Sequence, residues 1–375
     1  MGKKKGNNIV VTGGKTGGHI YPALAIADIL SDDLGANPFY IGAKDGMEAQ
    51  VLKNESIPFY GLSLGPLVGI SFSGKIKNML KNIGSFFRSF SLLGQIKPRL
   101  IIGTGGFVCG PVLAAAFFRR IPIIIHEQNV EPGITNRLLS HIAKEIWMTF
   151  NESASFFPKG KKKVLTGMPL RASFQKDSMT KKKAKAHFKF AENDKVLLVT
   201  GGSQGSRVIN RNIMESYKNI IEILGYKIIH ITGPSLYDEV VNQFDETTKN
   251  YIKDNKLIVT GYMNDMDIAL QAVDIAISRS GASFICELIS LSLFSIQVPL
   301  KTSAGNHQLK NAKVLEKVGL AKVIEEDELI KDSFYLALTS LQMGEIHTII
   351  KNKVGILYGQ STIEIIRRES EKYLR

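Results

Sequence analysis

The chain has 375 residues, 44% of them hydrophobic and 22% charged. This length suggests two domains, and this composition is that of a folded soluble protein and excludes a disordered one. We expect no secretory signal, because no apolar run suited to export follows the basic start of the chain. We also expect no membrane span, since the apolar stretch 107–118 is far too short to cross a bilayer.

Two cysteines are present, Cys109 and Cys286, each in an apolar setting. They are expected to be small core residues in a reducing compartment. No pair of acidic residues with the character of a divalent-metal site lies near the glycine-rich turns described below. We therefore predict neither a metal nor a cofactor.

The formal net charge of +14 is spread unevenly along the chain. Residues 1–168 hold 20 Lys and Arg against 10 Asp and Glu, whereas residues 169–375 hold 28 against 24. The stretch from Ser56 to His126 contains no acidic residue. A surface of one sign over so long a stretch indicates an anionic partner, either nucleic acid or an acidic membrane leaflet.

A glycine-rich turn separates an apolar run from a helical pattern near the N-terminus. The run Ile9–Val11 is typical of a buried parallel strand. The turn consists of Gly13, Gly14, Lys15, Thr16, Gly17, Gly18 and His19. Such a turn lets backbone N–H groups and a helix N-terminus face an anion. Its spacing fits neither a P-loop nor a dinucleotide fingerprint, and the histidine directly after the glycines is unusual.

Strands and helices alternate along the whole chain, which is the pattern of doubly wound parallel sheets. Strands are expected in the first half at 9–11, 38–41, 57–62, 100–102, 121–125 and 145–148. In the second half they are expected at 195–199, 227–231, 256–259, 274–277, 294–298 and 321–324. A second glycine-rich turn, residues 201–205, lies half the chain length after the first. Two strand–glycine turn–helix segments at this interval indicate an α/β fold of two Rossmann-like domains that face a cleft.

Residues 72–93 combine an apolar stripe at helical spacing with basic residues between its members. One interpretation is an amphipathic helix packed on the sheet, and the other is an aromatic and basic helix that lies on anionic lipid. Both can hold for different residues of one helix. The residues that we expect at a membrane are Phe72, Ile76, Lys77, Lys81, Phe86, Phe87 and Phe90.

Two further motifs follow strands of the first half. Residues 103–107 form a third glycine-rich turn, which alone indicates a tight turn as much as a ligand loop. His126, Glu127, Gln128 and Asn129 directly follow the strand at 121–125, at the strand ends where ligands collect in open α/β sheets. A zinc helix is excluded because position 130 is Val. For His126 we favour a supporting role over that of a base or a ligand.

Several motifs occur in an order that resembles a known family. They are residues 13–19 with the helix start at 22–25, then 126–129, 201–205 and 278–282. Together they resemble the MurG family, UDP-GlcNAc transferases of the two-domain GT-B fold that act on undecaprenyl-linked muramyl-pentapeptide. The resemblance spans the chain from about Ile9 to the C-terminus. It implies inverting transfer of GlcNAc from UDP-GlcNAc to the C4 hydroxyl of the muramic sugar of lipid I, which forms lipid II in peptidoglycan synthesis.

The resemblance also implies how the chain is divided. Residues 1–165 are expected to form an acceptor- and membrane-associating domain, joined by a C-terminal helix over 358–375. Residues 166–357 are expected to bind UDP-GlcNAc. Because the acceptor is held in the membrane by its polyprenyl tail, we expect a peripheral protein on the cytoplasmic face of the bacterial inner membrane. Its partners are then UDP-GlcNAc, lipid I and an anionic phospholipid surface, and not nucleic acid.

The resemblance assigns most of the binding residues. Backbone N–H groups of the glycine turns are expected to hold the acceptor diphosphate, at Gly14, Gly105 and Gly106. The donor is expected to bind Thr16, Gly17, Gly18, Asn129, Arg171, Ser203, Met263, Ala282, Ser283, Glu287 and Gln308. Arg171 suits a diphosphate because a guanidinium can bind phosphate through two parallel hydrogen bonds. Glu287 can accept hydrogen bonds from ribose hydroxyls.

For the general base we favour His19, because an imidazole titrates near neutral pH and this one directly follows the glycine turn. A supporting histidine that contacts the acceptor phosphate is an equal alternative, and Glu127 is the second candidate base. UDP is expected to leave without a metal, its charge held by backbone N–H groups and Arg171.

Two other functions stay open at this point. One is another GT-B enzyme for UDP-sugars, such as a UDP-GlcNAc 2-epimerase, which would share the donor domain but not the aromatic and basic helix. The other is a non-catalytic nucleotide-sugar- or lipid-binding protein, because Lys15 is inserted relative to the usual glycine turn and could displace His19. Met168, Phe284 and Asn306 also depart from the residues that the family usually carries.

Overall fold

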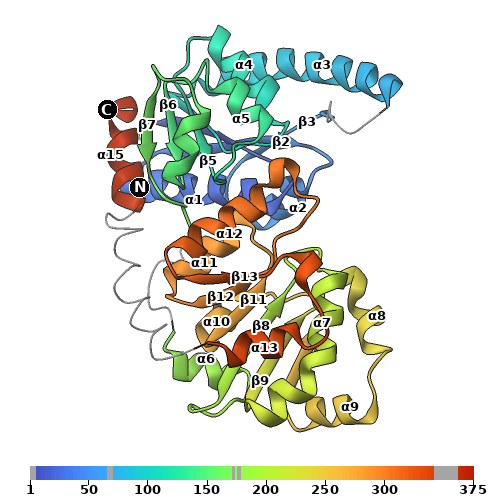
Figure 1. The fold of residues 1–375 in the computed structure, drawn as a ribbon. Helices are drawn as coiled ribbons and strands as arrows, with labels where there is room; N and C mark the ends of the chain where they lie inside the picture. The colour runs from blue at the N-terminus through green and yellow to red at the C-terminus, as the bar shows by residue number, and fades with distance from the viewer. Residues whose placement is uncertain (1–5, 66–70, 171–173, 175–178, 342–361) are drawn as a thin grey trace. The chain divides into compact units, whose positions relative to one another are not determined.

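The computed structural model describes residues 6–65, 71–170, 174, 179–341 and 362–375 (Figure 1). The chain forms two compact units, Met1–Arg171 with Gln360–Arg375, and Ala172–Gly359. Each unit is built on one parallel sheet. The predicted α/β fold of two Rossmann-like domains is confirmed.

The first unit has a seven-stranded sheet in the order β3-β2-β1-β4-β5-β6-β7. Its strands are β1 (Asn8–Thr12), β2 (Asn37–Ala43), β3 (Phe59–Leu62), β4 (Leu100–Gly103), β5 (Ile123–Glu127), β6 (Glu145–Met148) and β7 (Lys162–Leu165). The strand order reverses between β1 and β4, which pair in parallel. The loops after these two strands therefore lie together at the carboxyl edge of the sheet. They are the first and third glycine-rich turns.

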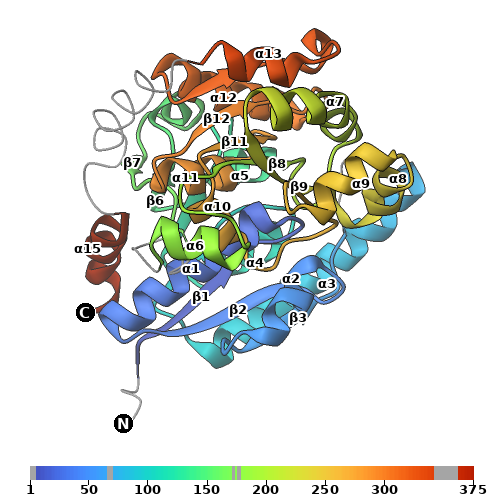
Figure 2. The same cartoon turned by 90° about the horizontal axis from the view of Figure 1, so that it is seen from below.

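Helices cover both faces of this sheet. They are α1 (Gly17–Leu34), α2 (Met47–Val51), α3 (Phe72–Ile96), α4 (Cys109–Phe118), α5 (Ile134–Leu139) and α15 (Thr362–Leu374), with 3-10 turns η1 (Leu52–Asn54) and η2 (Asn151–Phe156). On one face α1 and α15 share a core that includes the fully buried Ile26 and Ile366. On the other face α3 and α4 bury Leu93 and Val112. Figures 1 and 2 both show α15 beside α1.

Strand β7 is not among the strands expected from the sequence. Its charged residues are explained by its place at the sheet edge, where Lys162 pairs with Glu145 of β6 at 3.6 Å and with Glu369 of α15. Lys372 pairs with the same Glu369 at 2.9 Å. Partial burial opposes ionisation of Glu369, but hydrogen bonds from both lysines lower its pKa to about 2. This network ties the end of the chain to the first sheet.

The second unit has a six-stranded sheet in the order β10-β9-β8-β11-β12-β13. Its strands are β8 (Lys195–Thr200), β9 (Tyr226–Ile231), β10 (Leu257–Thr260), β11 (Ile275–Ser278), β12 (Phe294–Gln297) and β13 (Ala321–Val323). Its helices are α6 (Lys181–His187), α7 (Arg207–Lys218), α8 (Tyr237–Val241), α9 (Glu246–Lys253), α10 (Met266–Ala272), α11 (Ala282–Ser290), α12 (His307–Lys317) and α13 (Ser333–Thr339). The order reverses between β8 and β11, which brings the turns after them together.

A chain of hydrogen bonds crosses the core of the second unit. His230 of β9 is fully buried, with Nδ1 at 2.5 Å from the Tyr217 hydroxyl and Nε2 at 3.0 Å from Asn210 Oδ1. Asn210 Nδ2 donates to the Thr232 carbonyl at 3.0 Å, which fixes the amide and makes His230 Nε2 a donor. Burial lowers the pKa of His230 to about 3, so the ring is neutral at physiological pH.

This neutral histidine predicts loss of stability in acid. Because its pKa falls from 6.5 to about 3 on folding, the unfolded chain binds more protons between these values. The contribution is complete above pH 6.5 and is lost as the pH falls, by about 2 kcal/mol at pH 5. In urea denaturation followed by circular dichroism, H230Q should lose less stability than wild type between pH 7.5 and 5. Equal losses would contradict this assignment.

Candidate functional site

The first glycine-rich turn accommodates the inserted Lys15. This residue takes a left-handed backbone conformation with φ of 79°, and its N–H donates to Glu48 Oε2 at 3.4 Å. Glu48 is fully buried and also accepts from the Ala43 N–H at 2.8 Å. Helix α1 begins directly afterwards at Gly17, so that His19 lies in its first turn.

The third glycine-rich turn packs against the first through its backbone. The Gly14 N–H donates to the Gly105 carbonyl at 3.3 Å. Gly106 has φ of 84°, and a Cβ there would lie 2.5 Å from the Gly14 carbonyl oxygen. A Cβ on Gly105 would lie 2.9 Å from the His19 ring. Only glycine fits at both positions, and the predicted residues of the two turns are brought together.

Hydrogen bonds link His19 to the motif at the end of β5, residues 126–129. His19 Nδ1 lies 3.0 Å from Gln128 Oε1, and Gln128 Nε2 lies 3.0 Å from His126 Nδ1. His126 Nε2 lies 3.0 Å from the Gly167 carbonyl. Burial lowers the pKa of His126 to about 4, so this ring is neutral. The motif thus supports His19 through Gln128, a residue for which no role was predicted from the sequence.

Glu127 is buried beneath its own loop. Its Oε1 accepts from the Asn129 N–H at 2.9 Å and from Asn129 Nδ2 at 3.2 Å, and its Oε2 accepts from Asn136 Nδ2 at 2.8 Å. Burial raises its pKa, against the effect of these hydrogen bonds. These donors come from Asn129, directly after β5, and from Asn136 of α5, so the carboxylate holds the loop between β5 and α5 and positions Asn129.

In the second unit, Arg279 joins the turns after β8, β11 and β12. Its side chain donates to Ser206 Oγ at 2.7 Å and to the Val298 carbonyl at 3.1 Å, and it pairs with Glu326 at 2.5 Å. Ser206 is the N-cap residue of α7 and also accepts from the Ile209 N–H at 3.3 Å. Arg279 belongs to the motif at 278–282, but no role was predicted for it from the sequence. Its contacts hold these loops together.

The N-terminus of α11 offers donors for an anion. Its N-cap residue is Gly281, no side chain caps it, and its first turn carries no acidic residue. Among the described residues, the buried hydroxyls of Ser280 and Ser283 have no hydrogen-bond partner. Gln308 Oε1 accepts from the Ser280 N–H at 3.3 Å and from the Leu300 N–H at 3.0 Å. Both bonds use the amide oxygen, so a hydrogen bond from Gln308 to a ligand would come from its amide nitrogen.

Of the other predicted donor residues, Thr16, Gly17, Gly18 and Asn129 belong to the first unit, and Ala282 and Glu287 lie on α11. The rest lie on loops of the second unit or outside the described residues. Ser203 is exposed on the turn after β8, and Met263 is half-buried on the loop after β10. Asn306, in place of the usual acid, has φ of 57° at the start of α12, a conformation that Asn and Asp both tolerate. Arg171 lies outside the described residues.

An aromatic patch is formed by α3 and α4 together. Phe86 is half-buried and contacts Phe87 at 5.3 Å and Phe118 at 5.8 Å between ring centroids. Arg119 lies 4.0 Å above the ring of Phe90. The patch consists of Phe86, Phe87, Phe90, Phe117 and Phe118. Phe117 and Phe118 belong to α4, and their contact with the helix at 72–93 was not predicted from the sequence.

The C-terminal part of that helix packs on the sheet, as the first interpretation predicts. Leu92, Leu93 and Ile96 of α3 are buried in the core. Four other apolar residues of α3 are between 45% and 64% exposed, namely Ile76, Met79, Leu80 and Ile83. Lys77 and Lys81 are exposed as well, whereas the side chain of Phe72 lies outside the described part. Among the described residues no helix is long and apolar enough to cross a membrane.

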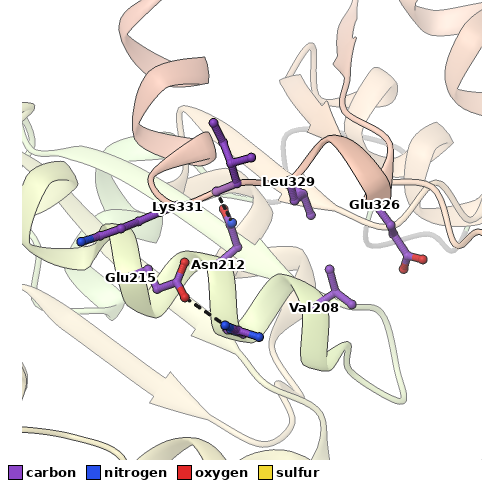
Figure 3. Close-up of a pocket in the computed structure, with 8 residues that line it drawn as sticks. Val208, Asn212, Glu215, Glu326, Leu329 and Lys331 are labelled. Carbon is purple, nitrogen blue, oxygen red and sulfur yellow. Dashed lines mark hydrogen bonds and ion pairs between the residues drawn. The ribbon is translucent and has the colours of Figure 1, made fainter.

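A separate pocket of about 340 Å³ lies between α7 and the segment before α13 (Figure 3). Asn212 Nδ2 donates to the Ile330 carbonyl across it at 2.7 Å, and Arg211 pairs with Glu215 at its rim at 3.3 Å. None of the predicted site residues lines this pocket. Within the described residues no group of three His, Cys, Asp or Glu could hold a metal ion.

Comparisons with known proteins agree over nearly the whole chain. The model of the glycosyltransferase family 28 N-terminal domain matches residues 9–148, and that of the family 28 C-terminal domain matches residues 196–347. A UDP-N-acetylglucosamine–N-acetylmuramyl-(pentapeptide) pyrophosphoryl-undecaprenol N-acetylglucosamine transferase from Desulforudis audaxviator is 36% identical over 334 residues, 89% of either chain. The protein of the same name from Bacillus subtilis is 35% identical over 339 residues, 90% of this chain and 91% of the relative.

Solved structures show the same fold. The crystal structure of Acinetobacter baumannii MurG matches with a TM-score of 0.72 at 24% identity, covering 97% of this chain and all (100%) of that one. The UDP-GlcNAc 2-epimerase from Neisseria meningitidis, bound to UDP-GlcNAc, matches with a TM-score of 0.67 at 16% identity, covering 97% and 99%.

Proposed function

The chain belongs to the MurG family of UDP-N-acetylglucosamine transferases, and from this premise we propose that it transfers GlcNAc to the C4 hydroxyl of the muramic sugar of lipid I with inversion. The product is lipid II. The observation that carries this proposal is the pair of interlocked glycine turns with His19 in the first turn of α1. A transfer assay with UDP-GlcNAc and a short-chain lipid I analogue tests it.

We propose His19 as the general base. The imidazole accepts the proton of the C4 hydroxyl while the oxygen forms a bond to the anomeric carbon of the donor. The bond between that carbon and the diphosphate oxygen breaks, and UDP leaves with the electron pair. Support comes from the place of His19 beside Gly105, at the edge of the turn proposed to bind the acceptor diphosphate. Glu127 is the weaker candidate because its carboxylate is buried among donors of its own loop.

Each unit supplies backbone donors for one substrate. The two packed turns at Gly14, Gly105 and Gly106 are proposed to hold the acceptor diphosphate, with the Gly106 N–H as a donor, because the N–H groups of Gly14 and Gly105 donate to the Gly105 carbonyl and to Cys109 Sγ. In the second unit, the uncapped N-terminus of α11 with the hydroxyls of Ser280 and Ser283 suits the diphosphate of UDP-GlcNAc. These donors can stabilise the charge that develops on UDP as it leaves.

Glu287 of α11 is proposed to bind the ribose hydroxyls of the donor. E287A should raise the KM for UDP-GlcNAc about 10–100-fold, because a hydrogen bond to a charged group contributes about 1.5–3 kcal/mol. The kcat should change much less. Steady-state rates with UDP-GlcNAc as the varied substrate measure this, and S290A, which changes the exposed last residue of the same helix, is the control. An unchanged donor KM in E287A would remove Glu287 from the site.

We further propose that the aromatic patch and the lysines of α3 bind the anionic surface of the cytoplasmic leaflet. Phe87 and Phe118 are 66% and 67% exposed, and exposed aromatic clusters of this kind mark interaction sites. The sequence from Ser56 to His126 carries no acidic residue, and Lys77 and Lys81 are exposed on α3. Phospholipid fits this mixture of apolar rings and cations better than nucleic acid does.

Vesicle binding tests the membrane proposal. F87S/F118S should weaken binding to anionic vesicles at least tenfold, and K77E/K81E should weaken it by about fivefold or more per lysine, since each contributes about 1 kcal/mol. High salt should abolish the second effect and spare the first. Matched controls in the second unit are I330S/L336S, whose apolar side chains are 66% and 51% exposed, and K182E/K183E. If both test variants sediment with vesicles like wild type, the membrane face lies elsewhere.

A further inference from the structure

Two main-chain carbonyls fix the orientation of every group between Gly167 and His19. A carbonyl oxygen can only accept a hydrogen bond. His126 Nε2 lies 3.0 Å from the Gly167 carbonyl, so this nitrogen carries the proton of the neutral ring. His126 Nδ1 is then the acceptor. It lies 3.0 Å from Gln128 Nε2, which donates to it.

The main-chain carbonyl of His126 fixes the orientation of the Gln128 amide independently. Gln128 Nε2 also lies 3.0 Å from the main-chain carbonyl of His126, so the amide nitrogen must stand on this side. The amide oxygen consequently faces His19, at 3.0 Å from Nδ1. Gln128 and His126 are 1% and 0% exposed, so water does not compete for these groups. An amide oxygen can only accept, and His19 Nδ1 therefore carries a proton.

From this chain we infer that Gln128 and His126 are positioning residues, which hold neutral His19 as the tautomer with its proton on Nδ1 and its lone pair on Nε2. The inference rests on His19 being the base of the proposed function. Nε2 then takes the proton of the acceptor hydroxyl, and the Nδ1–H bond to Gln128 persists in both charge states of the ring. No group has to turn during the reaction, which is how a fixed hydrogen-bond partner assists a catalytic imidazole.

Gly105 holds the ring from the other side. A Cβ on Gly105 would lie 2.9 Å from both Cε1 and Nδ1 of His19, so the ring packs on the glycine backbone. The Thr104 hydroxyl donates to the main-chain carbonyl of His19 at 2.7 Å. Ring and backbone of His19 are thus both fixed, and a single hydrogen bond to Gln128 sets the tautomer.

The tautomer can be read directly by ¹⁵N NMR of protein labelled at histidine, with H19A used to assign the signals. Wild type should show His19 protonated at Nδ1 at a pH where the ring is neutral. Q128M, which keeps the volume but removes the amide, should lose this signature and lower kcat about 10–100-fold, the usual cost of losing a partner that orients a functional imidazole. The donor KM should stay within about twofold.

Q128E is the conservative variant, because its protonated carboxyl can still accept from His19 and donate to His126. It should keep the Nδ1–H signature and recover part of the kcat that Q128M loses. A neutral His19 protonated at Nε2 in wild type would overturn the inference, as would a wild-type kcat in Q128M. If instead H19A is fully active while the Nδ1–H signature is present, the proposed base is wrong although the hydrogen-bond chain is right.

Discussion

Replacing His19 by alanine should lower kcat about 10²–10⁴-fold, the range expected when a general base is lost. The donor KM should change little, because His19 belongs to the first unit, on which the acceptor is proposed to bind. The measurement is the initial rate of GlcNAc transfer with each substrate varied in turn. His19 is held by Gln128 and packs on Gly105, so truncation to alanine removes the imidazole without leaving a buried charge.

The control for this experiment is H141A, which removes an exposed histidine from the turn after α5 in the same unit. It should be as active as wild type. If H19A also keeps wild-type kcat, the base lies elsewhere, and E127Q becomes the variant to measure next. A large rise in donor KM with normal kcat would place His19 at the donor instead.

The second large effect is expected from Gly106→Ala. A Cβ there would lie 2.5 Å from the Gly14 carbonyl oxygen and 3.2 Å from its carbon, and the backbone has φ of 84°. Neither contact is with a flexible side chain, so the two glycine turns must move apart. Overlap and left-handed strain together should cost about 2–5 kcal/mol of folding stability. Denaturant unfolding measures this loss, and transfer activity should fall with it.

Gly110→Ala is the matched control, only four residues further along the chain. Gly110 lies inside α4, and a Cβ there would meet no atom within 4 Å. This substitution should be neutral or stabilise by up to about 1 kcal/mol, since alanine favours a helix over glycine. Equal stabilities of the two variants would show that the turns are not packed as described.

The fold could be predicted because most of its strands are short apolar runs, some of which are followed by glycine-rich turns. Strand β6, for example, has the bounds expected from the sequence, Glu145–Met148. Strand β7 could not be predicted, because its sequence is polar and it exists by pairing with β6 at the sheet edge. The partner of its Lys162 is Glu369, more than 200 residues away, which no local pattern indicates.

The candidate site was only partly visible in the sequence. His19 stands out because it directly follows glycines, but the role of Gln128 depends on its contact with His19 and on the His126 ring, which the Gly167 carbonyl orients. Phe117 and Phe118 join the aromatic patch through the packing of α4 on α3. Arg279 gains its place from loops of three different strands. Each of these depends on tertiary contacts, whereas the glycine turns are set by local backbone geometry.

The central claim is tested most directly by following radiolabelled UDP-GlcNAc with purified protein and a short-chain lipid I analogue, in excess chelator. We expect one UDP released for each GlcNAc transferred, and a disaccharide product with inverted anomeric configuration. A strict requirement for Mg²⁺ would contradict the proposed release of UDP without a metal. Conversion of UDP-GlcNAc without transfer to the analogue would indicate an epimerase, and absence of any turnover would indicate a binding protein; either result would contradict the transferase reaction.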